Sequence, residues 1–220
     1  RSAGDVHIYG NPHLTTDPLR TLQVARNITT GLKRVAPDRA ATFEAGLEKF
    51  QDKIYRKLYG DRLVELIGGP TLEQLSLGGT LFQFLDKQQY EGHALTQELG
   101  GWLKQGEGFR GKQMICYHKN WAYLEDRFDV TCADYIEAKP GIPPTPGHVA
   151  QLIERMKSEK IHVLFAASYF DREKVETVAK RAGATLVQVP MEPGVRPGMD
   201  DYFSLVDAWV SGLAAAFSGS

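Results

Sequence analysis

The sequence predicts an α/β protein whose C-terminal part, residues 111–220, is a lobe with a four-stranded parallel sheet flanked by helices. After Gly111, strand-like and helical patterns alternate four times, which is typical of a parallel sheet covered on both faces. Two long helical patterns precede this part with no strand between them. Between these two regions, glycines divide the chain into short helical pieces.

The first long helical pattern begins at Asp17 and Pro18, a good N-cap residue followed by one suited to the first helical position. Leucine and isoleucine then recur every three to four residues. A second such pattern starts after Pro37 and ends at Gly60, a residue common at helix C-termini. Residues 17–60 are therefore predicted to be long connecting helices.

The next segment, residues 61–110, is less regular. Glycines interrupt its apolar pattern at Gly68-Gly69, at Gly78-Gly79, and again at Gly92. Such interruptions favour short helices separated by turns. We expect a helical insertion packed on the main body.

The C-terminal lobe is predicted in detail by its alternating patterns. Strands are expected at residues 112–118, 130–136, 161–168 and 184–190, and helices at residues 120–128, 148–160, 171–183 and 200–217. Asp171 suits the start of the third of these helices and Gly183 its end. A proline-rich loop, residues 139–147, follows the second strand.

Composition limits the classes of function. The formal net charge is −1, so no global basic field indicates nucleic acid or an anionic membrane as a partner. No apolar run approaches the roughly 18 residues of a membrane span. The chain opens on RSAGDVHIYG, which does not resemble a signal peptide and suggests a processed product or a fragment.

Two cysteines, Cys116 and Cys132, fall in neighbouring strand-like runs. We expect two buried thiols, which is the usual state of apolar cysteines. The alternative is one disulfide between neighbouring strands, which would require an oxidising compartment.

Candidate functional residues come from the carboxyl ends of the strands, where parallel sheets bind ligands. His118 stands where the first strand becomes a helix, a common metal-binding or catalytic position, although it would also suit a structural histidine. The expected strand ends hold this histidine and several carboxylates, at residues 117–120, 135–137, 166–171 and 189–192. We expect the remaining histidines outside the opening motif to be incidental: His7, His93, His148 and His162. No HExxH, CxxC, GxSxG or P-loop pattern occurs.

Several stretches then agree with one family. NPHLTTDP, residues 11–18, resembles the NPH-x-W-x-DP motif of the zinc- and manganese-binding substrate-binding proteins of bacterial ABC transporters (cluster A-I). ICYHKNWAYLEDRFDV resembles their strand ending in a histidine and followed by an aromatic-rich helix. Residues 139–190 and 198–217 resemble their proline-rich loop, later strands and closing helix. The likeness excludes only about residues 61–101.

The resemblance implies two α/β lobes joined by a long helix, with a divalent metal held between them. Most of the N-terminal lobe, including its leading histidine, has no counterpart here. We therefore expect a fragment, or a protein that lost this lobe, and His7 is not a convincing substitute. The segments would be a remnant of that lobe with the metal-ligand loop (1–16), the connecting helices (17–60), the insertion (61–110) and the C-terminal lobe (111–220).

The same resemblance implies the metal ligands residue by residue. His13 matches the histidine of the NPH motif, and His118 matches the histidine after the first strand of the second lobe. A carboxylate normally follows the last strand, and Glu192 is the nearest candidate. Asp200 is its competitor, although it would also suit the N-cap of the last helix. Thr15 replaces the tryptophan of the motif and should weaken packing around His13.

The implied function is extracytoplasmic capture of a divalent metal, Zn²⁺ or as the second choice Mn²⁺, for delivery to an ABC permease. The protein would be periplasmic, or membrane-anchored in a Gram-positive organism, and we expect a monomer that is not an enzyme and binds no nucleic acid. Imidazole and carboxylate ligands suit zinc, whereas an oxygen-rich set would suit manganese.

Two alternatives belong to other classes. A metal-dependent hydrolase could use the same histidines and carboxylate with one coordination position left for water. No general base stands beside these residues in the sequence. A metal-free, flavodoxin-like interaction domain would leave NPHLTTDP unexplained.

Overall fold

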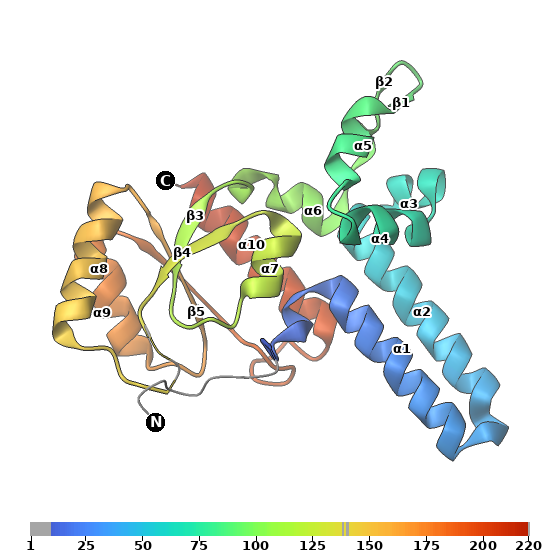
Figure 1. Ribbon diagram of the computed structural model, residues 1–220, viewed down its shortest axis with the longest axis horizontal. Helices are drawn as coiled ribbons and strands as arrows, with labels where there is room; N and C mark the ends of the chain where they lie inside the picture. The colour runs from blue at the N-terminus through green and yellow to red at the C-terminus, as the bar shows by residue number, and fades with distance from the viewer. Residues whose placement is uncertain (1–9, 138, 140, 220) are drawn as a thin grey trace. The chain divides into compact units, whose positions relative to one another are not determined.

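A computed structural model describes residues 10–137, 139 and 141–219. The chain forms two compact units (Figure 1). One comprises Arg1–Thr16 with Gly106–Ser220, and the other is Asp17–Gln105. These units group residues differently from the four expected segments, because 61–105 cluster with the connecting helices.

The helical unit is built on a hairpin of two long helices, α1 (Pro18–Val35) and α2 (Ala40–Tyr59), joined through a short 3-10 turn (Figure 1). Asp17 caps α1 by accepting a hydrogen bond from Leu19 N at 2.9 Å, and Pro18 occupies the first helical position. These local signals are enough to place the helix start, as predicted.

The rest of this unit consists of short elements: α3 (Asp61–Ile67), α4 (Gly69–Leu77), α5 (Leu81–Lys87), β1 (Gln89–Tyr90), β2 (His93–Ala94), η3 (Leu95–Glu98) and α6 (Gly101–Gln105). The predicted helical insertion also contains a short β-hairpin formed by β1 and β2. Glu91 and Gly92 form the turn between these strands with φ of 50° and 88°. Two consecutive residues with positive φ are typical of a tight β-hairpin.

A partly buried ion pair fastens α1 to α4. The guanidinium of Arg26 donates to both carboxylate oxygens of Glu73, at 2.6 and 2.7 Å. The hydroxyl of Tyr55, on α2, donates to the same carboxylate. Burial raises the pKa of Tyr55, and the hydrogen bond to the Glu73 carboxylate and its negative charge raise it further. The hydroxyl therefore keeps its proton and remains a donor. The network therefore ties three helices together.

The other unit holds the predicted parallel sheet, in the order β4-β3-β5-β6. Its strands are β3 (Gln113–Cys116), β4 (Thr131–Tyr135), β5 (Val163–Ala167) and β6 (Thr185–Val189). The chain moves from β3 to β4 on one side and then crosses to β5 on the other. This reversal places a topological switch point at the carboxyl end of β3, where ligands bind in such sheets.

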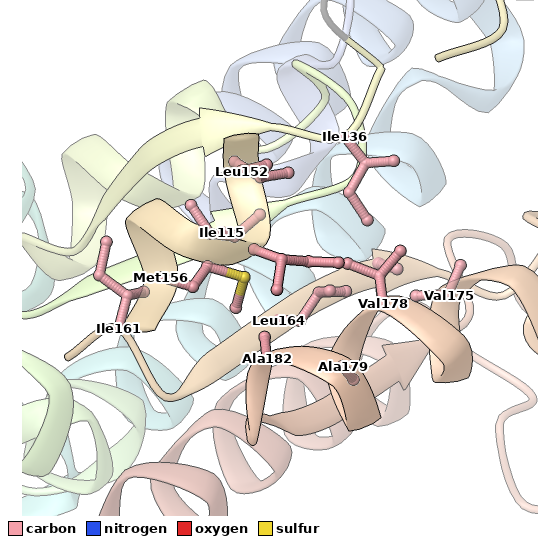
Figure 2. Close-up of a cluster of buried hydrophobic side chains, with 12 residues drawn as sticks. Ile115, Ile136, Leu152, Met156, Ile161, Leu164, Val175, Val178, Ala179 and Ala182 are labelled. Carbon is pink, nitrogen blue, oxygen red and sulfur yellow. The ribbon is translucent and has the colours of Figure 1, made fainter. Parts of the chain in front are cut away.

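Helices cover both faces of this sheet. They are η4 (Gly106–Phe109), α7 (Ala122–Phe128), α8 (Pro146–Ser158), α9 (Arg172–Ala182) and α10 (Tyr202–Ser218). Figure 2 shows the core under α8 and α9, a cluster that includes Leu164 of β5, Leu152 of α8 and Val178 of α9. Phe165 points to the other face, where its ring centroid lies 4.2 Å from that of Trp121.

Helix caps in this unit agree with the sequence except at one residue. Asp171 accepts hydrogen bonds from Glu173 N and Lys174 N, and Gly183 ends α9 in the left-handed conformation. The last helix is capped by Asp201, which accepts from Ser204 N in a capping box. The alternative role considered for Asp200, that it caps this helix, was therefore wrong, since the helix begins one residue later.

The two cysteines form a disulfide, so the expectation of two thiols was wrong and the alternative is confirmed. Cys116 on β3 and Cys132 on β4 have Cα atoms 5.5 Å apart. They are brought together because β3 and β4 pair side by side, with Cys132 opposite Met114. The bond crosslinks two neighbouring strands of the sheet.

No helix within the described part of the chain has both the length and the apolar character needed to cross a bilayer.

Candidate metal centre

His13 stands directly before a short 3-10 turn, η1 (Leu14–Thr16). Its main-chain N–H donates to Oδ1 of Asn11 at 3.0 Å, and its ring Nδ1 lies 2.6 Å from the same oxygen. Thr16 Oγ1 donates to the carbonyl of His13 at 2.9 Å. Both the backbone and the ring of His13 are therefore held by local hydrogen bonds.

Three longer-range hydrogen bonds hold this loop on its unit. Asn11 Nδ2 donates to Lys119 O at 2.9 Å, and the Tyr123 hydroxyl donates to Asn11 O at 2.8 Å. The Tyr202 hydroxyl donates to Thr15 O at 3.0 Å. The loop is thus held by α10 and by the segment after β3. At Thr15, which stands where the family motif has a tryptophan, the contact to α10 is made by the main-chain carbonyl and not by a side chain.

His118 follows β3 at the switch point of the sheet. Its Nδ1 lies 2.7 Å from Oε2 of Glu137, and both side chains are nearly buried, at 14% and 13% exposure. The distance is that of an ion pair, although the ring is not aligned for a hydrogen bond. Glu137 follows β4, and its Oε1 accepts from Gly141 N at 2.7 Å.

The two histidines of the predicted site lie together. Their ring centroids are 5.9 Å apart and their planes meet edge to face at 76°. Two imidazoles bound to one zinc through bonds of about 2.0–2.1 Å have centroids roughly 5 to 6 Å apart. The spacing of His13 and His118 therefore suits a shared metal ion.

The predicted carboxylates are not grouped with this pair. Glu192 and Asp200 lie between β6 and α10, and both are exposed. Among the described residues, no three or more histidine, cysteine, aspartate or glutamate side chains form a group suited to a metal. Glu192 nevertheless follows β6 as Glu137 follows β4, so both come after the carboxyl ends of strands in the same parallel sheet.

Tyrosines around the site remain neutral. Burial raises the pKa of Tyr117 and Tyr169, with smaller contributions from the negative charge of Glu137, and it raises the pKa of Tyr135 to about 12. Tyr169 also accepts a hydrogen bond from Asn120 Nδ2 at 3.1 Å. Negative charge near the histidines therefore comes from carboxylates and not from phenolates.

Glu137 was missed as a partner of His118, although it belongs to the strand ends singled out in the sequence. The sequence could have indicated this partner only if β3 and β4 were known to be neighbours, since the first residues after adjacent parallel strands meet at one edge of the sheet.

A cavity of about 800 Å³, lined by Tyr117, Phe170 and Glu137 among others, opens beside the Glu137 carboxylate under α8 and α9.

The other histidines lie elsewhere. His148 Nε2 contacts Tyr135 O at 2.8 Å, and His93 Nε2 contacts Glu98 Oε1 at 2.5 Å. His162 is exposed just before β5, at the opposite end of that strand from the site. His7 lies outside the described residues.

Comparison with known proteins supports one family. Residues 91–216, more than half of the chain, match the family described as zinc-uptake complex component A periplasmic (ZnuA). The high-affinity zinc uptake system protein ZnuA of Brucella abortus is 29% identical over 114 residues, which are 51% of this chain and 33% of that protein. The matched region thus spans about a third of the length of these curated relatives.

Solved structures show the same fold. A crystal structure of ZnuA superposes with a TM-score of 0.63 at 17% identity, covering 94% of this chain and 62% of the other. The substrate-binding protein FpvC of Pseudomonas aeruginosa, in complex with Mn²⁺, gives 0.61 at 16% identity, covering 95% and 62%. The family match, supported by this fold, shows that the chain belongs to the family of periplasmic zinc-uptake complex component A.

Proposed function

We propose that this protein is an extracytoplasmic solute-binding protein that captures a divalent transition metal and delivers it to an ABC permease. The observation that carries the proposal is the 5.9 Å separation of the His13 and His118 rings. Two imidazoles from distant parts of a chain, held at this spacing, are suited to bind one ion between them. The relatives reported above are named for zinc uptake or were solved with a metal.

Zinc is the favoured metal and manganese the second candidate. Nitrogen donors such as imidazole suit zinc, whereas manganese prefers oxygen ligands. Glu192 is proposed as the carboxylate that completes the site, with Asp200 as its competitor. Closure of the β6–α10 segment over the histidines would bring such a carboxylate to the ion.

The proposed location is supported by the disulfide. A bond between Cys116 and Cys132 is typical of proteins in oxidising compartments such as the periplasm. The description of the matching family also names the periplasm. A hydrolase using these residues has no support among the relatives reported above, none of which is named as an enzyme.

Calorimetric titration of the purified chain with Zn²⁺ tests the proposal. Single substitutions His13→Ala and His118→Ala should each abolish most of the zinc binding, because each removes one of two adjacent donors. His162→Ala is the matched control, since this exposed histidine lies away from the site and its loss should leave affinity unchanged. Unchanged affinity in both site variants would reject the site.

A further inference from the structure

We infer that Asn11 and Glu137 are positioning residues that hold His13 and His118 by Nδ1, so that both rings present Nε2 to the metal. The inference rests on the proposed metal site and deepens it. In each metal-binding histidine, the ring nitrogen that does not bind the metal would donate a hydrogen bond to an oxygen. This arrangement fixes both the tautomer and the direction of the ring.

The contact between Asn11 and His13 determines the tautomer of that ring. Asn11 Nδ2 donates to the carbonyl of Lys119, a group that can only accept, so the amide orientation is set. Its Oδ1 then faces His13 and also accepts the main-chain N–H of that residue. The ring Nδ1, 2.6 Å from this oxygen, must carry a proton. A metal on His13 is therefore bound through Nε2.

The contact between Glu137 and His118 has the same consequence. An ionised carboxylate only accepts, so an oxygen 2.7 Å from Nδ1 favours the proton on that nitrogen. Glu137 is itself held, since its other oxygen accepts from Gly141 N and its main-chain N–H donates to Tyr117 O at 2.8 Å. The ring is not aligned for a hydrogen bond in this structure, so the inference requires His118 to turn toward this fixed carboxylate.

The two supports are connected. Lys119, whose carbonyl receives the Asn11 side chain, is the residue after His118. Displacing either ligand loop therefore disturbs the other. The two supports also differ in charge. The carboxylate of Glu137 makes the His118 imidazole a stronger donor to the metal, whereas the neutral amide of Asn11 mainly sets the direction of the His13 ring.

Two other histidines provide an internal contrast. His148 places Nε2 against the Tyr135 carbonyl, and His93 places Nε2 against Glu98. Both should therefore carry the proton on Nε2, the opposite tautomer to that inferred for the site. All four rings can be compared in a single sample.

Long-range ¹⁵N–¹H NMR of the metal-free protein, at a pH where histidine is neutral, reads these tautomers directly. We expect Nδ1–H on His13 and His118, and Nε2–H on His93 and His148. Asn11→Ala and Glu137→Ala should move the corresponding ring toward Nε2–H. Asn11→Asp keeps an oxygen beside Nδ1 of His13 and should preserve its Nδ1–H, although it loses the hydrogen bond to Lys119 O. Glu137→Gln has a single oxygen for Gly141 N and His118, so it should shift the His118 ring only partly toward Nε2–H.

Zinc affinity, measured with the metal alone, should fall about 10- to 100-fold in the two alanine variants and less in the conservative ones. Nε2–H on either site histidine of the wild type, or tautomers unaffected by the alanine substitutions, would overturn the inference. Failure of the proposed function is seen separately, as zinc affinity that survives loss of His13 and His118. The tautomer measurement requires no metal, so the two failures are distinguishable.

Discussion

The side chain of Asn11 donates a hydrogen bond to the main-chain carbonyl of Lys119 at 2.9 Å, across 108 positions of sequence. This bond joins the loop that carries His13 to the loop that carries His118. Both loops belong to the same compact unit. The two histidines therefore lie in one unit, although the residues of the helical unit, 17–105, stand between them in the sequence.

The carboxylate of the proposed site can be identified by substitution. Glu192→Gln should lower zinc affinity roughly tenfold or more, since a lost ligand should cost at least as much as a lost outer-shell partner. Asp200→Asn serves as the matched variant, from the same exposed segment, and should bind zinc like the wild type. The reverse result in calorimetry would make Asp200 the ligand, and no loss in either variant would exclude both residues.

The disulfide between Cys116 and Cys132 should contribute measurably to stability. It closes a loop with a sequence separation of 16, and removing a bond of this span lowers the free energy of unfolding by about 3 kcal/mol. The double variant Cys116→Ala/Cys132→Ala should show this loss in urea titration followed by tryptophan fluorescence. Adding reductant should destabilise the wild type and leave the double variant unchanged; equal sensitivity would contradict the role of the bond.

Two glycines of the helical unit should respond to alanine in opposite directions. At Gly69 an added Cβ would lie 1.9 Å from the Tyr55 ring, so overpacking should cost about 1–3 kcal/mol. At Gly46, exposed within α2, an added Cβ meets nothing within 4 Å, and Gly46→Ala should stabilise by about 0.5–1 kcal/mol. Thermal unfolding of both variants checks the signs. Stabilisation by Gly69→Ala would show that α4 does not pack closely on Tyr55.

Glu125 should make stability depend on pH. Burial raises the pKa of its carboxyl, and the hydrogen bond from Cys132 N, at 2.6 Å, lowers it in part. Because the folded state holds this proton more tightly than the unfolded chain, the contribution is present at acidic pH and is lost as pH rises through the folded pKa. Glu125→Gln, which still accepts from Cys132 N, should therefore raise the melting temperature at pH 7 and lose this advantage near pH 4.

Asp126→Asn is the control for that measurement, because this carboxylate is exposed on the same helix. Its melting temperature should follow that of the wild type across the pH range. A Glu125→Gln variant that is less stable than the wild type at pH 7 would show that the charged form of Glu125 is favourable in the fold.

Much of the fold could be predicted because its determinants are local. The caps Asp17 and Asp171 place helix starts through hydrogen bonds to residues two or three positions away. The alternation of buried strands and amphipathic helices after Gly111 is typical of a parallel sheet, in which helices on both faces cover the apolar strands. The order of strands along the sheet is not local and came from the structure.

By itself, the sequence singled out His13 and His118 as candidate metal ligands, because they match histidines of the family that it resembles and stand beside a capped helix and a strand end. Only the tertiary structure decided what surrounds them. Glu137 meets His118 because β4 pairs with β3, and Cys132 bonds to Cys116 for the same reason. Strand pairing is a long-range choice made by the packing of the whole sheet, so local pattern and spacing do not reveal these partners.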